Sequence, residues 1–292
     1  QLFSSPFNHD KKLLAFSDSV QDASHRSGFF AARTYTFNLR GAIQKTVMAA
    51  GGPVPFDNLA SRFLDDWRRR LGAEEFVATF LPPDMEWLDD FEALRRTGKL
   101  PEESNLNELL ERRLKWEIWS EYTFDCRIGR TLEKTGSSTI EIKPELWRRI
   151  IDLLLPRLRE NIGPLRDIDE SLLTRFLAGL IQNLKNHGAV NQPDLLPFID
   201  SLGNVWLLGK RGGETLWRPN FSRRTRAPVF LTSRPGQRFQ TLLRQTGNAS
   251  PTWYEDWLER SFNKLSPAAA YEAGEIFKIV LAGLKETSLV FE

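Results

Sequence analysis

Apolar side chains recur every three or four residues along most of this chain, and proline or glycine separates one run from the next. This spacing places the apolar residues on one face of an α-helix, and that face must be buried against another element. Gly51-Gly52-Pro53 and Pro82-Pro83 are strong helix breakers. The pattern predicts helices over residues 20–32, 37–50, 55–71, 74–80, 85–97, 105–129, 144–162, 172–186, 194–202, 238–245, 253–265 and 268–287. A mainly α protein follows, because few segments remain for a sheet.

Three short segments have a strand-like pattern instead. Residues 13–16 are apolar and run directly into the polar turn Ser17-Asp18-Ser19, so they predict a strand, a turn and then a helix. Residues 204–208 and 215–218 flank a glycine-rich basic tip and predict a β-hairpin. The alternation over residues 139–142 predicts either a short strand or an extended linker. The expected fold is therefore mainly α with small β elements.

Composition limits the class of protein without naming a function. The chain has 292 residues, 41% of them hydrophobic and 27% charged, which suits two or three globular domains. Cys126 is its single cysteine, which excludes an internal disulfide and a cysteine-rich zinc site. No apolar run approaches the roughly 20 residues that span a bilayer, and the first residues lack the pattern of a signal peptide. We expect a cytoplasmic protein with no membrane partner.

Motifs for catalysis and nucleotide binding are missing from this sequence. It contains no GxxxxGK[ST] phosphate loop and no Asp-Glu-x-His or Asp-Glu-Ala-Asp motif for magnesium. His9, His25 and His187 have no metal-like spacing, and no GxSxG nucleophile elbow occurs. Adjacent carboxylates such as Asp65-Asp66 fall on helix surfaces. We therefore expect no catalytic residue and no metal ligand within the chain.

The distribution of charge is more informative than its total of +2. Residues 62–122 contain 15 acidic and 10 basic residues, a net charge of −5. Residues 203–250 contain nine basic residues and one acidic residue, a net charge of +8, and eight of the nine are arginines. Arginine forks suit phosphate recognition, and aromatic residues such as Trp206 and Trp217 lie among them. This segment favours nucleic-acid contact, with a solvated surface loop as the alternative.

The order of elements around the basic segment indicates a winged-helix-like domain. A helix over 172–186, a short helix over 194–202 and then a hairpin is the order found at the end of a winged helix. Lys210 and Arg211 lie at the tip of the wing, and an arginine-rich arm follows it. Such modules dock on nucleic-acid backbones or on neighbouring protein domains, and both alternatives stay open. The predicted contacts to nucleic acid are Lys210, Arg211, Arg223, Arg224 and Arg226.

Two neighbouring runs resemble motif IV of large bacterial superfamily 2 helicases: LAFSDSVQDA over residues 14–23 and HRSGFF over residues 25–30. These helicases are DEAD/DEAH-box-type motors, and they include phage-defence and DUF1998-associated helicases. Residues 128–136 also resemble this family. In such motors motif IV opens the second RecA-like lobe and lies beside the nucleic acid. The resemblance implies that Ser17 and Ser19 offer donors to a phosphate and that Asp18 orients the turn, with Gln21 and Arg26 nearby. Alternatively Asp18 or Ser19 caps the following helix, and both roles are compatible.

The resemblance implies that the chain is a fragment of a larger motor. Four segments are then expected. They are the start of a RecA-like lobe with one βα unit (1–50), a helical insertion (51–138), a winged-helix-like domain with basic wing and arm (139–235) and a C-terminal helical segment (236–292). ATP and magnesium would bind outside this chain, which alone would be inactive. The expected partners are DNA or RNA, the remaining helicase domains and defence-system subunits. The alternative is a helical protein–protein interaction scaffold that does not touch nucleic acid.

Overall fold

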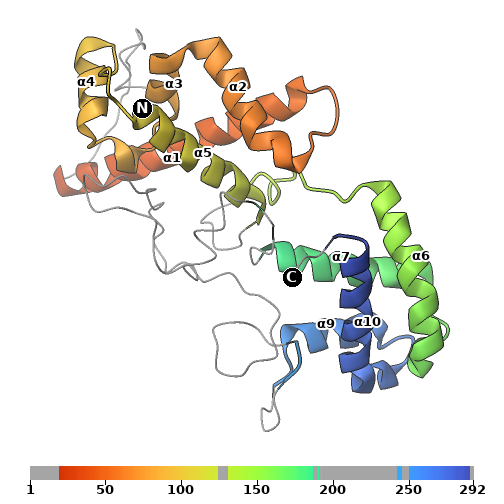
Figure 1. The fold of residues 1–292 in the computed structure, drawn as a ribbon. Coiled ribbons are helices and arrows are strands. Elements are labelled where there is room, and N and C mark those ends of the chain that lie inside the picture. Colours follow the sequence, from red (N-terminus) through yellow and green to blue (C-terminus); the bar gives the residue numbers. More distant parts are fainter. Residues whose placement is uncertain are drawn as a thin grey trace. The chain divides into compact units, whose positions relative to one another are not determined.

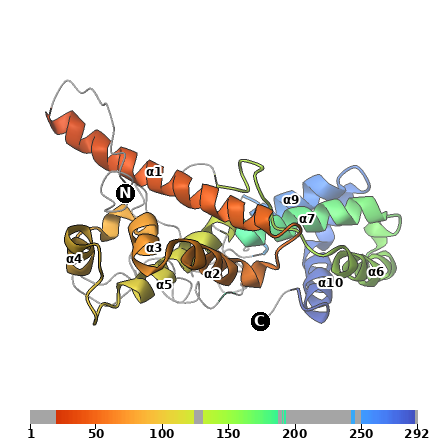
Figure 2. The same cartoon turned by 90° about the horizontal axis from the view of Figure 1, so that it is seen from above.

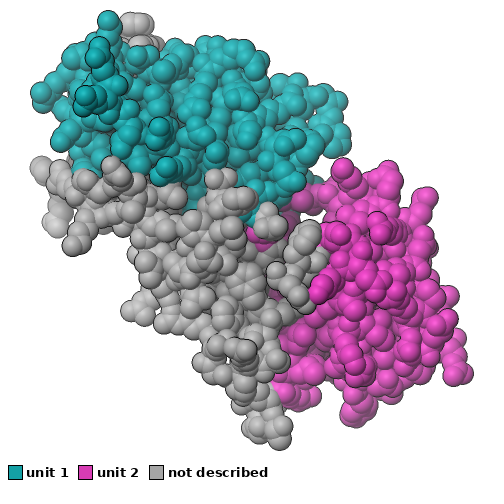
Figure 3. Space-filling view, viewed as in Figure 1, with its two compact units in different colours: residues 1–122, 126–139, 191–226 teal, residues 123–125, 140–190, 227–292 magenta. Residues whose placement is uncertain are grey.

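The computed structural model describes residues 20–123, 131–186, 190, 192, 242–244 and 250–289, and the side chains of residues 20–33 and of Asp84 are not among those described. The chain divides into two compact units, coloured separately in Figure 3. The first holds residues 1–122, 126–139 and 191–226, and the second holds 123–125, 140–190 and 227–292. All regular structure in the described residues is helical, which confirms the mainly α expectation.

The first unit is built on one long helix, α1 (Val20–Ala49). The short 3₁₀ helix η1 (Phe56–Asn58) leads into α2 (Leu59–Leu71), which returns beside α1, as Figure 1 and Figure 2 show. Then follow α3 (Ala73–Phe80), η2 (Pro83–Met85), α4 (Asp89–Thr97) and α5 (Leu106–Thr123). Gly72 and Gly98 end α2 and α4 with φ of +74° and +72°, a conformation that glycine adopts without strain.

Helix α1 corrects the expectation of two separate helices over 20–32 and 37–50. Residues 33–36 contain neither glycine nor proline, so the backbone hydrogen bonds continue without a break. Tyr35, Leu39 and Ile43 follow one another at a spacing of four residues and are all buried, which gives the continuous helix one apolar face. The result is a single 30-residue helix.

Aromatic side chains fill the core of the first unit. Phe63 meets Phe80 with ring centroids 5.2 Å apart, and Phe80 also meets Phe76 at 5.1 Å. Phe56 packs edge-on against Trp119 at 4.7 Å, which attaches the start of the α2 region to α5. Edge-to-face and tilted pairs of this kind add about 0.5–1.5 kcal/mol beyond the burial of their area. The α1–α2 hairpin is thereby held against α3 and α5.

The second unit begins with α6 (Pro144–Asn161), η3 (Gly163–Leu165) and α7 (Glu170–Asn186). It is completed by α9 (Trp253–Phe262), η5 (Pro267–Glu272) and α10 (Ala273–Glu286). These helices share one apolar core, in which Phe176 meets Phe262 at 4.8 Å. A capping box starts α9: Glu255 N–H donates to the Thr252 hydroxyl, and Thr252 N–H donates to the Glu255 carboxylate at 2.8 Å.

Only some of the predicted strands and short helices fall within the described residues. The strand at 13–16, the helix at 194–202 and the hairpin at 204–218 lie outside the described residues. Residues 139–142 take no regular structure, as the linker alternative predicted. Residues 242–244 are not helical, so that part of the predicted 238–245 helix is wrong. The division into four segments stays a prediction. Within the described residues, no helix is both long and apolar enough to cross a membrane.

Candidate functional site

Most residues predicted to contact nucleic acid lie outside the part of the chain that the structure describes. These are Ser17, Asp18, Ser19, Lys210, Arg211, Arg223, Arg224 and Arg226. Gln21 and Arg26 lie in the first two turns of α1, and their contacts stay predictions. Helix α1 begins at Val20, so the polar triplet at 17–19 directly precedes the first turn of a 30-residue helix.

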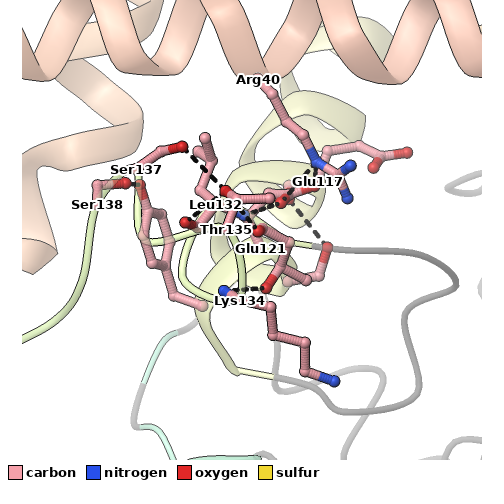
Figure 4. A network of polar contacts seen from close by, with 11 residues as sticks. Arg40, Glu117, Glu121, Leu132, Lys134, Thr135, Ser137 and Ser138 are labelled. Atoms are coloured by element: carbon pink, nitrogen blue, oxygen red, sulfur yellow. Dashed lines mark hydrogen bonds and ion pairs between the residues drawn. The ribbon is translucent and has the colours of Figure 1, made fainter.

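Farther along α1, Arg40 enters a buried polar network with α5 and the segment 131–138 (Figure 4). Arg40 Nε donates to the Glu121 carboxylate and lies 3.0 Å from each of its oxygens. The Glu121 side chain is 0% exposed and that of Arg40 is 14% exposed. Glu121 Oε2 also accepts the backbone N–H of Leu132 at 3.0 Å. One carboxylate therefore links α1, α5 and the segment 131–138.

A second buried ion pair lies one turn away on α5. Arg113 Nε donates to Glu117 Oε1 at 2.9 Å, and both side chains are at most 4% exposed. Glu117 and Glu121 are four residues apart and share one face of α5. Among the described residues, two arginine–carboxylate pairs thus lie where little water reaches them. Pairing is required here, since an uncompensated buried charge costs several kcal/mol.

The segment 131–138 carries its own hydrogen bonds. The Thr135 hydroxyl lies 3.0 Å from the Thr131 carbonyl and 2.9 Å from the Leu132 carbonyl, and Gly136 has φ of +68°. Tyr122 and Ser138 join their hydroxyls at 2.8 Å. Burial, more than any other cause, raises the pKa of Tyr122, so its phenol stays neutral. The segment is a fixed turn attached to α5.

This network connects α1, α5 and the segment 131–138. The Glu121 carboxylate accepts hydrogen bonds from a guanidinium and from a backbone amide. Within the described residues, no group of three or more His, Cys, Asp or Glu side chains could hold a metal ion. The arrangement fixes the second half of α1 relative to α5.

Sequence reasoning missed Arg40, Glu117 and Glu121, although the last two carried a signal. Both fall on the apolar face of the helix predicted over 105–129, in phase with Leu110, Leu114 and Ile118. A charged residue at a core position needs a buried partner. That partner, Arg40, lies 81 residues away from Glu121, and no sequence pattern pairs the two.

Comparison with known proteins adds no relative on which to base an assignment, because no protein-family model, curated protein or solved structure matches this chain.

Proposed function

We propose that this chain is the accessory, nucleic-acid-binding portion of an ATP-dependent DNA or RNA helicase or translocase. The observation that carries the proposal is the motif-IV-like run over residues 14–30, which ends in a helix beginning at Val20. The residues for ATP and magnesium belong to other domains of the parent motor. The proposed fold includes a βα unit at the start and a winged helix around residues 172–218. Defence-system subunits are further partners, and the compartment is cytoplasmic.

In this proposal α1 connects the bound nucleic acid to the other helices of the first unit. From Val20 to Arg40 the helix rises about 30 Å, at about 1.5 Å per residue. Ser17, Asp18 and Ser19 at its N-terminal end contact a backbone phosphate. Arg40, in the second half of the helix, is anchored to the buried Glu121 carboxylate. A movement of the phosphate-binding turn is thereby carried to α5 and to the segment 131–138.

The basic segment supplies the second contact. Lys210 and Arg211 on the wing and Arg223, Arg224 and Arg226 on the arm bind the phosphate backbone without reading its sequence. Replacing the three arm arginines by alanine weakens the binding of labelled DNA or RNA. The slope of log Kobs against log salt becomes shallower by up to about 2.7 for duplex DNA, at about 0.9 for each phosphate that is no longer neutralised. Fluorescence anisotropy between about 50 and 200 mM salt measures both effects.

The matched control replaces the exposed Arg95, Arg96 and Lys99 by alanine, which removes the same charge from α4 and from the turn after it. This control keeps the slope of the unmodified chain. The proposal is wrong if neither single- nor double-stranded DNA, nor RNA, binds at about 50 mM salt. The isolated chain shows no ATPase activity in the same preparations.

The scaffold alternative is favoured by a different observation. Phe37 and Met48 are 66% and 70% exposed, and their spacing of 11 residues puts them on one face of α1. Exposed apolar residues at such a spacing fit a helix that docks on protein. Under this alternative the arm substitution leaves the chain's behaviour unchanged, whereas Phe37→Ser with Met48→Ser disrupts its association with a partner subunit.

A further inference from the structure

Trp67 of α2 lies against α1 in an orientation set by both helices. Its Nε1 donates toward the Ala42 carbonyl at 3.3 Å and the Thr46 hydroxyl at 3.2 Å, both on α1. The indole also packs edge-on against Phe80, with ring centroids 5.4 Å apart. The ring is only partly buried, so an immobile aromatic surface remains accessible beside the α1–α2 seam.

Two cations flank this ring from different helices. Lys45 Nζ of α1 lies 6.0 Å from the ring centroid, and the Arg70 guanidinium carbon of α2 lies 5.3 Å from it. At these distances the π system attracts both cations and orders their side chains. Among the ion pairs of the described residues, neither Lys45 nor Arg70 takes part, and both residues are exposed. Their charges therefore stay available to an external anion.

Two further arginines directly precede Arg70 on α2. Arg69 is 77% exposed and has only a distant contact of 3.9 Å to Asp66, which Arg62 shares at 3.8 Å. The adjacent Arg68 is neutralised by Glu111 at 2.9 Å and covers the Phe76 ring instead. We call Lys45, Trp67 and Arg70 the Trp67 surface. It is a basic and aromatic surface within a stretch whose overall charge is acidic.

We propose that the Trp67 surface is a second, separate contact for the phosphate backbone of nucleic acid. The nucleic-acid backbone presents closely spaced negative charges that can meet several fixed cations at once. Arginine forks beside a partly exposed indole suit phosphates next to a base or sugar. The inference goes beyond the proposed function, which places nucleic acid at residues 17–26 and 210–226. It rests on that function only for the class of partner.

The test removes the two cations that flank the ring and keeps Trp67, which packs against Phe80 and α1. The variant is Lys45→Gln with Arg70→Gln, and the control is Arg96→Gln with Lys99→Gln, an equal change of charge elsewhere in the same unit. Labelled single- and double-stranded oligonucleotides are titrated at several salt concentrations, and circular dichroism confirms equal folding. For duplex DNA the slope of log Kobs against log salt becomes shallower by about 1.8, and for single strands by about 1.4. The control keeps the original slope.

The outcomes separate this inference from the proposed function. If the Lys45 and Arg70 variant matches its control in affinity and slope, the Trp67 surface does not bind nucleic acid. If it loses affinity for polyglutamate but not for oligonucleotides, the surface docks acidic protein and the inference is equally overturned. Binding that survives the arm substitution but weakens in this variant removes the arm assignment and supports the Trp67 surface. If the whole chain binds no nucleic acid, both are wrong.

Discussion

Glu121 shows how one residue can hold several parts of the first unit together. Its carboxylate accepts from Arg40 of α1 and from the amide of Leu132, while its own backbone belongs to α5. The side chain is completely buried, so water cannot replace either partner. The exposed pair of Arg157 and Glu286 offers a contrast: it has two contacts of 2.8 Å, and Arg157 lowers the pKa of Glu286. In water such a pair adds little.

Replacing Glu121 by alanine should therefore lower the free energy of unfolding by about 3–5 kcal/mol, since Arg40 is left largely buried without its counter-charge. Glu286→Ala is the matched control, because it also breaks an arginine–carboxylate pair but at an exposed position, and it should change stability much less. Urea unfolding followed by circular dichroism measures both variants. Equal decreases for the two would show that burial of the Arg40–Glu121 pair is unimportant.

At the scale of helices, breakers mark many of the predicted bounds correctly, whereas the helices predicted to begin at residues 55, 85 and 268 begin as α-helices only at Leu59, Asp89 and Ala273. Pro144 begins α6, and glycines with positive φ follow α2 and α4. The division of α1 was wrong because Thr34, Tyr35 and Thr36 reduce helix propensity by only tenths of a kcal/mol. Burial of Tyr35 and Leu39 outweighs that cost. Local preference is decisive at helix ends, and tertiary packing is decisive in the middle.

Two helical glycines should respond to alanine with opposite signs. In α7, a Cβ at Gly179 would overlap the Trp257 indole, whose Nε1 is held by the Phe176 carbonyl at 3.0 Å. Gly179→Ala should destabilise the protein by about 1–3 kcal/mol through overpacking. In α1, no neighbouring atom of the described residues lies within 4 Å of a Cβ at Gly41, so Gly41→Ala should stabilise the protein by about 0.5–1 kcal/mol. Thermal melting distinguishes the two, and a stabilising Gly179→Ala would contradict the close packing of α7 and α9.

At the scale of the whole molecule, the chain forms two cores from segments that alternate in sequence. Helices α6 and α7 share a core with α9 and α10, although more than 60 residues separate the two pairs. Contacts between such distant segments cost loop-closure entropy, so they form only when enough apolar surface is buried. The sequence pattern showed which helix faces are apolar, but it could not show which helix covers each of them.

Two cores should also unfold separately. Glu121 belongs to the first unit and Gly179 to the second, and they share no contact partner in the described residues. In differential scanning calorimetry Glu121→Ala should lower one transition and Gly179→Ala the other. In the double variant the two effects should add within about 0.5 kcal/mol. A single transition lowered by both variants would show that the units unfold as one.

The sequence alone determined that the chain is mainly α and where most of its described helices lie. Apolar spacing and the glycine and proline breakers act over a few residues, so they can be read without knowing the fold. The sequence also indicated residues 17–26 and 210–226 as contacts to nucleic acid, and these roles stay predictions. Only the tertiary structure decided that Arg40 pairs with Glu121, 81 positions away, and that Lys45 of α1 meets Trp67 of α2. Such partners are distant in sequence, and only packing that excludes water selects them from the many charges along the chain.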